Sequence, residues 1–214
     1  MREDVKRPYD ASGRRERSAR RRQEVIDATR SLLVERGYGG TTVAAVADSV
    51  GVHVDTVYRL VGRKAELAAE VVEQALSGVD AVVPAVERSY VADILAESDP
   101  GAKLDRYADA TVGMLVRLAP IVRALRDAGE EGAEAQALWR EFAERRATNL
   151  LQFADDLLAT GGVRADLDRE AVATEVWLHG SPETYLLLTG DRGWTTDRYR
   201  RWLAATWRRT LLAP

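Results

Sequence analysis

The sequence predicts an all-α protein with a charged arm, a small three-helix N-terminal domain and a larger helical domain. Apolar residues recur at spacings of three and four along most of the 214-residue chain, the pattern of amphipathic helices. No stretch alternates apolar and polar residues as a half-buried strand would. Breaks in the pattern place the arm at 1–17, the N-terminal domain at 18–64 and the C-terminal domain at 65–214.

The N-terminal elements are predicted from local signals. Residues 1–17 carry many charges without apolar periodicity, so we expect a disordered basic arm. A first helix is expected over about 18–36, with Gly37 as its stop. Thr42 is predicted to cap a second helix at 43–50, because a threonine side chain can accept a hydrogen bond from the first turn.

The rest of the chain reads as helices separated by glycine and proline breaks. Asp168 and Thr195 are predicted caps, and Ser181 either caps a restarted helix or marks a kink in a longer one. A helix starting near Arg63 is expected to end before Pro84. The expected helices after the second are 54–61, 63–83, 85–97, 103–127, 134–160, 168–179, a segment from 182, and a last helix from 196.

Residues 41–64 have the pattern of a helix, a tight glycine turn and a second short helix. Val46 and Ala47 fall on one face of the first helix, and Val57 can face the same core from the second. Gly51 stands where the chain must turn back and tolerates a positive φ. The residues left on the outer surface of the second helix are Val54, Asp55, Thr56, Tyr58 and Arg59. A short helix anchored at its back and exposed at its front fits the major groove of DNA.

Further motifs surround this pattern in a fixed order. They are V-I-D-A at 25–28, L-L at 32–33, E-R-G-Y at 35–38, T-T-V at 41–43, V-A at 46–47, V-G-V at 50–52, T-V-Y at 56–58, and Lys64 with Leu67. In these residues, the stretch 21–76 resembles the DNA-binding domain of the TetR family of bacterial regulators. The chain departs from the family at His53, where serine is common, at Leu60, where histidine is frequent, and at Val61, where an aromatic residue is usual.

The resemblance implies which side chains contact phosphate. It assigns a backbone phosphate to the Tyr58 hydroxyl, and it makes Thr42 and Lys64 phosphate clamps at two helix N-termini, where free N–H groups already favour an anion. His53 has three readings, a weak cap, a phosphate contact or a plain exposed side chain, of which we favour the contact.

Base contacts are expected from the first turn of the second short helix. Val54 can meet a thymine methyl group, and Asp55 can accept from cytosine N4 or simply stabilise the helix dipole. Thr56 can reach a base or a phosphate, and Arg59 a phosphate or a guanine edge. The arginines of 14–22 either follow the DNA backbone, insert in the minor groove or form a solvated tail.

Charge separates the two ends of the chain. Residues 1–64 hold 14 Lys and Arg against 9 Asp and Glu, a net charge of +5, whereas residues 65–214 hold 17 against 25, a net charge of −8. The basic end coincides with the helix-turn-helix, where phosphate must be met. We therefore favour DNA binding over a merely solvated surface for this end.

Composition argues against several other classes of protein. There are no cysteines and only two histidines, so we expect no disulfide, no metal site and no cofactor. No phosphate loop or nucleophile motif appears, and we expect no enzyme activity. No apolar run is long enough for a bilayer and no secretory signal begins the chain, so a cytoplasmic protein without membrane contact is expected.

The C-terminal domain is expected to bind a ligand and to form a homodimer, as the resemblance implies. Candidate pocket residues, each of which could instead be plain core, are Tyr107, Met114, Trp139, Phe142, Phe153, Trp177 and His179. Candidate dimer residues are Trp177, Tyr185, Leu186, Trp202 and Trp207, since aromatic side chains suit interfaces.

The expected function is regulation of transcription by a homodimer bound to a palindromic double-stranded DNA operator. A repressor released by a small-molecule effector is the favoured form. An activating or ligand-independent regulator fits nearly as well, and a non-specific DNA-binding protein is a further alternative.

Overall fold

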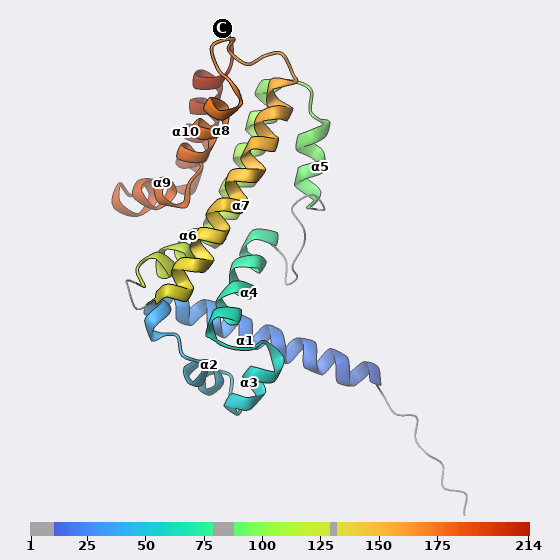
Figure 1. The fold of residues 1–214 in the computed structure, drawn as a ribbon, viewed down its shortest axis with the longest axis vertical. Helices are drawn as coiled ribbons and strands as arrows, with labels where there is room; N and C mark the ends of the chain where they lie inside the picture. The colour runs from blue at the N-terminus through green and yellow to red at the C-terminus, as the bar shows by residue number, and fades with distance from the viewer. Residues whose placement is uncertain (1–10, 79–87, 129–131) are drawn as a thin grey trace, which may run out of the picture.

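The computed structural model describes residues 11–78, 88–128 and 132–214, and within them it is built of helices (Figure 1). No strand occurs in these ranges, which confirms the all-α prediction; the only β-type pairing there is an isolated bridge between Val163 and Leu212. The elements are α1 (Ala11–Gly40), α2 (Val43–Ser49), α3 (Val54–Leu60), α4 (Lys64–Ser77), α5 (Ser89–Ala96), α6 (Pro100–Arg126), α7 (Ala133–Leu158), α8 (Arg169–His179), α9 (Pro182–Leu186), the π-helical segment η3 (Leu187–Asp191) and α10 (Thr196–Leu211).

Figure 1 shows how these helices are arranged. The short helices α2 and α3 lie beneath α1, at the end of the molecule opposite the C-terminus. The long helices α6 and α7 run side by side through the other part of the molecule, with α8 and α10 on one flank and α5 on another. The helix α4 connects the two parts and packs on α1, α6 and α7.

The predicted helix caps are confirmed. Four side chains each accept a hydrogen bond from the backbone N–H three residues further on: Thr42 from Ala45 (3.0 Å), Asp168 from Ala171 (2.8 Å), Ser181 from Thr184 (3.0 Å) and Thr195 from Arg198 (3.2 Å). Ser181 therefore begins a new helix, so the reading of one long kinked helix is wrong. These caps were predictable because they depend only on neighbouring residues.

The start of α1 and the end of α4 differ most from the prediction. Helix α1 begins at Ala11, so residues 11–17 of the expected arm are helical; alanine, arginine and glutamate there favour helix propagation. Residues 1–10 lie outside the described part. Helix α4 ends at Ser77, well before Pro84, because Gly78 takes a left-handed φ of 74° and closes it. Pro84 is also outside the described residues.

The expected break at Gly37 is present as a non-helical φ of 69° and ψ of 177° within α1.

Three apolar clusters hold the described helices together. One lies among α1 to α4 and contains Val25, Val46, Val57 and Leu67. A second joins the inner faces of α1 and α4 to α6 and the start of α7, and a third fills the space among α5 to α8, α9 and α10. Because the second cluster is continuous across α1, α4 and α6, the N-terminal helices rest directly on the larger domain. The division at residue 64 stays a prediction.

In the described ranges, none of the helices combines the length and the apolar character that crossing a bilayer demands.

Candidate nucleic-acid interface and a second candidate site

Helices α2 and α3 form a rigid helix-turn-helix. Val46, Ala47 and Val57 are fully buried between them and the neighbouring helices. Gly51 adopts a φ of 65°, and the Val52 N–H donates to the Ala47 carbonyl at 3.0 Å, which closes the turn. Packing therefore fixes the back of α3, as predicted, and leaves its other face to solvent.

The exposed face of α3 carries most of the predicted DNA contacts. Asp55, Tyr58 and Arg59 are exposed, and 49% of the Tyr58 surface is accessible. Thr56 is half-buried. The placement of Val54 on the outer surface is wrong in part, since Val54 is half-buried and packs against the apolar cluster of this domain. None of these DNA contacts is itself tested by the structure.

His53 caps α3 from an exposed position. Its Nδ1 accepts a hydrogen bond from the Asp55 N–H at 3.4 Å and lies 3.4 Å from an Asp55 carboxylate oxygen. At that length the cap is weak. The side chain is 80% exposed, so its proposed phosphate contact stays a prediction.

The two predicted phosphate clamps differ in their availability. Thr42 is exposed, and its hydroxyl accepts the capping hydrogen bond, which leaves its own hydrogen free to donate. Lys64 is half-buried: its Nζ lies 4.1 Å from the centre of the Tyr38 ring and 3.5 Å from the Gly39 carbonyl oxygen. Burial lowers the pKa of Lys64, while the charge of Glu134 opposes that shift. The phosphate contacts of Thr42 and Lys64 both stay predictions.

Tyr38 connects this domain to α7, a contact that the sequence reading missed. Its ring is buried, and its hydroxyl donates to the Glu134 carboxylate at 3.1 Å. Burial and the bond to Glu134 raise the pKa of Tyr38 to about 12, so the hydroxyl stays a donor at neutral pH. The residues are 96 positions apart, and no local sequence signal pairs them.

Replacing Tyr38 with Phe is expected to lower the free energy of unfolding by about 1 kcal/mol. The change removes a hydrogen bond to a carboxylate but keeps the buried ring. Urea unfolding measures the effect. Glu134→Gln, which retains an acceptor oxygen, serves as the milder comparison. A Tyr38→Phe protein as stable as the native one would show that the bond contributes nothing.

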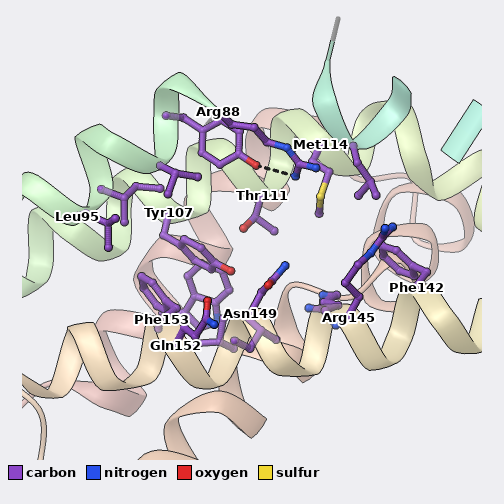
Figure 2. Close-up of a pocket in the computed structure, with 18 of the residues that line it drawn as sticks. Arg88, Leu95, Tyr107, Thr111, Met114, Phe142, Arg145, Asn149, Gln152 and Phe153 are labelled. Atoms are coloured by element: carbon purple, nitrogen blue, oxygen red, sulfur yellow. Dashed lines mark hydrogen bonds between the residues drawn. The ribbon is translucent and has the colours of Figure 1, made fainter. Parts of the chain in front are cut away.

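A second candidate site is a cavity of about 460 Å³ within the larger domain (Figure 2). The predicted pocket residues Tyr107, Met114, Phe142 and Phe153 all line it, and the Tyr107 and Phe153 rings stack with their centres 3.8 Å apart. Figure 2 shows Thr111 and Met114 on one wall and Asn149 on the facing one. The volume is in the range of small-molecule sites.

The other three predicted pocket residues do not line this cavity. Trp139 packs against Phe142 with ring centres 5.4 Å apart. Trp177 lies beneath the Arg146 guanidinium, and His179 meets the edge of Trp202. Each packs against another side chain rather than forming the cavity wall.

Several lining residues were not predicted. They include Glu73 of α4, Trp207 of α10, and the α7 residues Arg145, Arg146, Asn149 and Gln152. Spacings of three and four along α7 place its lining residues on one face. This stripe of mixed apolar and polar residues is the feature of the sequence from which they could have been predicted.

Two of the predicted dimer residues are wrong. Trp207 is fully buried and Tyr185 is 8% exposed, both within the core of a single chain. They follow the inner stripe of their helices, whereas Trp202 and Leu186 are half-buried. The large apolar side chains exposed nearby are Leu178 on α8 and Leu187 on η3.

Comparison with known proteins identifies the N-terminal part. Residues 25–71 match the family model described as "Bacterial regulatory proteins, tetR family". No curated protein matches the chain in sequence.

Solved structures extend the likeness to the whole fold. The chain resembles a protein described as a transcriptional regulator from Saccharomonospora viridis in complex with choline (TM-score 0.70, 16% identity, covering 92% of this chain and 100% of that one). It also resembles NalD of Pseudomonas aeruginosa, the secondary repressor of the MexAB-OprM multidrug efflux pump (0.69, 20%, 92% and 98%). The ketosteroid regulator KstR2 of Mycobacterium tuberculosis is a further match (0.60, 17%, 91% and 96%).

Proposed function

We propose that this chain, which belongs to the tetR family of bacterial regulatory proteins by its N-terminal domain, is a homodimeric repressor released from a palindromic operator by a small molecule. The more general role of a DNA-binding transcriptional regulator follows from membership of this family. The observation that carries the proposal is the outer face of α3, which presents Asp55, Tyr58 and Arg59 from a helix anchored by fully buried Val57.

A homodimer is supported by apolar surface on the C-terminal helices. Leu178 and Leu187 are 57% and 55% exposed, and half-buried Trp202 lies on the neighbouring α10. Helix α10 contacts both α8 and η3, so the three residues lie on neighbouring elements, and we refer to them as the α8–α10 face. Large apolar side chains left exposed are typical of an interaction surface. A dimer doubles the number of base contacts and requires an operator of two-fold symmetry.

Release by an effector is supported by the position of α4. This helix begins at Lys64, directly after α3, and its far end contributes Glu73 and Leu76 to the cavity wall. A ligand that displaced this end would move the start of the helix and with it α3. Among the similar structures, NalD is a repressor, which agrees with repression. The S. viridis protein holds choline, which agrees with the binding of a small molecule.

Selection from random DNA duplexes followed by footprinting tests the proposal. The expected result is one palindrome with half-sites about one helical turn, or a multiple of it, apart. Protection without sequence preference would instead identify a non-specific DNA-binding protein. Transcription from a promoter carrying the selected site then separates repression from activation.

Two substitutions on α3 are expected to have different effects. Tyr58→Phe should weaken binding to all sequences by about fivefold, because it removes one phosphate contact of roughly 1 kcal/mol. Asp55→Asn should instead relax the preference at one base pair, because an amide can donate where the carboxylate only accepts. Fluorescence anisotropy with the operator and with single-base variants measures both. A change of base preference in Tyr58→Phe would contradict the phosphate assignment.

A further inference from the structure

The cavity carries an excess of positive charge in an otherwise largely apolar wall. Its charged lining residues are Arg88, Arg145, Arg146 and Glu73. Arg145 and Glu73 form an ion pair with each other, so their charges offset. Apolar side chains, among them Ile94, Met114, Phe142 and Phe153, make up most of the remaining wall.

Arg146 has no acidic partner among the residues that the structure describes. Its guanidinium donates to the Trp177 carbonyl at 2.9 Å and lies 4.5 Å from the Trp177 ring centre, but it forms no ion pair there. The side chain is half-buried, and burial lowers its pKa, while the carboxylate charge of Glu183 opposes that shift. Glu183 itself is paired with Arg126 at 2.6 Å. A partly buried guanidinium without a counter-ion is less stable than a paired one, so this site favours an anion.

We propose that the cavity binds an apolar monocarboxylate, whose carboxylate pairs with Arg146 and whose body packs against Met114, Phe142 and Phe153. This inference rests on the proposed function, since it names the effector class of the same cavity. A carboxylate matches the Arg146 guanidinium, and the mostly apolar wall accommodates the rest of the molecule. A cationic ligand would add to the positive charge already present, and a neutral one would leave Arg146 without its counter-ion.

Calorimetric titration of the full-length protein with three matched probes tests the proposal. Decanoate, 1-decanol and decyltrimethylammonium, each below its micelle concentration, share one alkyl chain and differ in charge. Decanoate is expected to bind about tenfold tighter than decanol or more, with the cation weakest. Equal or tighter binding of decanol or of the cation would overturn the proposal, and so would the absence of binding by all three.

Substitution of Arg146 assigns the preference to one side chain. Arg146→Gln should remove the advantage of decanoate over decanol, and Arg146→Lys should keep part of it. Arg140→Gln is the matched control, because Arg140 lies exposed on the same helix outside the cavity wall, and it should keep the native preference. Retention of the preference in a folded Arg146→Gln protein would overturn the proposal. If that variant does not fold, Arg146→Lys decides: a preference identical to the native one then counts against a guanidinium–carboxylate pair.

Operator binding without ligand is measured separately on the same proteins. A protein that binds its operator but prefers the neutral or cationic probe contradicts only the effector class. A protein that binds no specific DNA contradicts the proposed function itself.

Discussion

Replacing Asp156 with Ala is expected to lower the free energy of unfolding by about 3 kcal/mol. Lys103 on α6 is only 2% exposed, and its ammonium group donates to the Asp156 carboxylate on α7. Removing the carboxylate leaves a buried positive charge without its partner, and the protein must either hydrate that charge or release its proton on folding. The pair joins α6 to α7, two helices that form the cavity walls.

The neighbouring carboxylate is a matched control. Asp155 pairs with Arg169 at 2.9 Å, but both side chains are about half exposed, at 56% and 46%. Asp155→Ala should therefore cost about 1 kcal/mol or less. The double variant Lys103→Met, Asp156→Ala should regain most of the lost stability, because it removes the stranded charge and fills its space. Urea unfolding at one protein concentration compares the four proteins. Equal losses in Asp155→Ala and Asp156→Ala would show that burial of Lys103 is not the cause.

The elements that the sequence predicts well depend on near neighbours. The capping side chains of Thr42, Asp168, Ser181 and Thr195 reach only three residues along the chain, so their roles can be inferred without the fold. The helix-turn-helix is similarly local: a glycine turn and a few apolar positions determine which face of α3 is left to solvent.

Contacts between distant segments could not be predicted in this way. Lys64 was expected to be free for a phosphate, yet it lies against Tyr38, which in turn bonds to Glu134. The pairs Lys103–Asp156 and Glu73–Arg145 likewise join different helices. Periodicity shows that a helix has an apolar stripe, but it does not show which neighbour that stripe meets.

The aromatic residues of α10 illustrate the same limit. Tyr199, Leu203 and Trp207 recur at spacings of four, and all three are fully buried within one chain. Trp202 is displaced from that stripe and is half-buried. An apolar stripe can pack into its own domain or against a partner, and the sequence pattern is the same in both cases. Burial separates the two, and it removes Trp207 and Tyr185 from the proposed dimer surface.

Placing a charge on the α8–α10 face is expected to have the largest effect on DNA binding. Leu178→Asp should convert the proposed dimer to a monomer, because a carboxylate buried in an apolar interface loses its hydration without gaining a partner. A monomer presents one α3 to the operator instead of two. If each half-site makes two good base contacts of about 2 kcal/mol each, operator affinity should fall about a thousandfold.

Leu95→Asp is the matched control for oligomeric state. Leu95 is also 57% exposed, but it lies on α5, on a different flank of the long helices from α8 and α10 (Figure 1). Sedimentation velocity at micromolar concentration should give a monomer for Leu178→Asp and a dimer for Leu95→Asp and the native protein. Leu187→Asp provides an independent probe on the same face, with the same expected result. Unchanged helical circular dichroism in each variant would exclude unfolding. A Leu178→Asp protein that remains dimeric with native operator affinity would show that the interface lies on another surface. A native protein that is monomeric would contradict the dimer itself, and with it the reason to expect a palindromic operator.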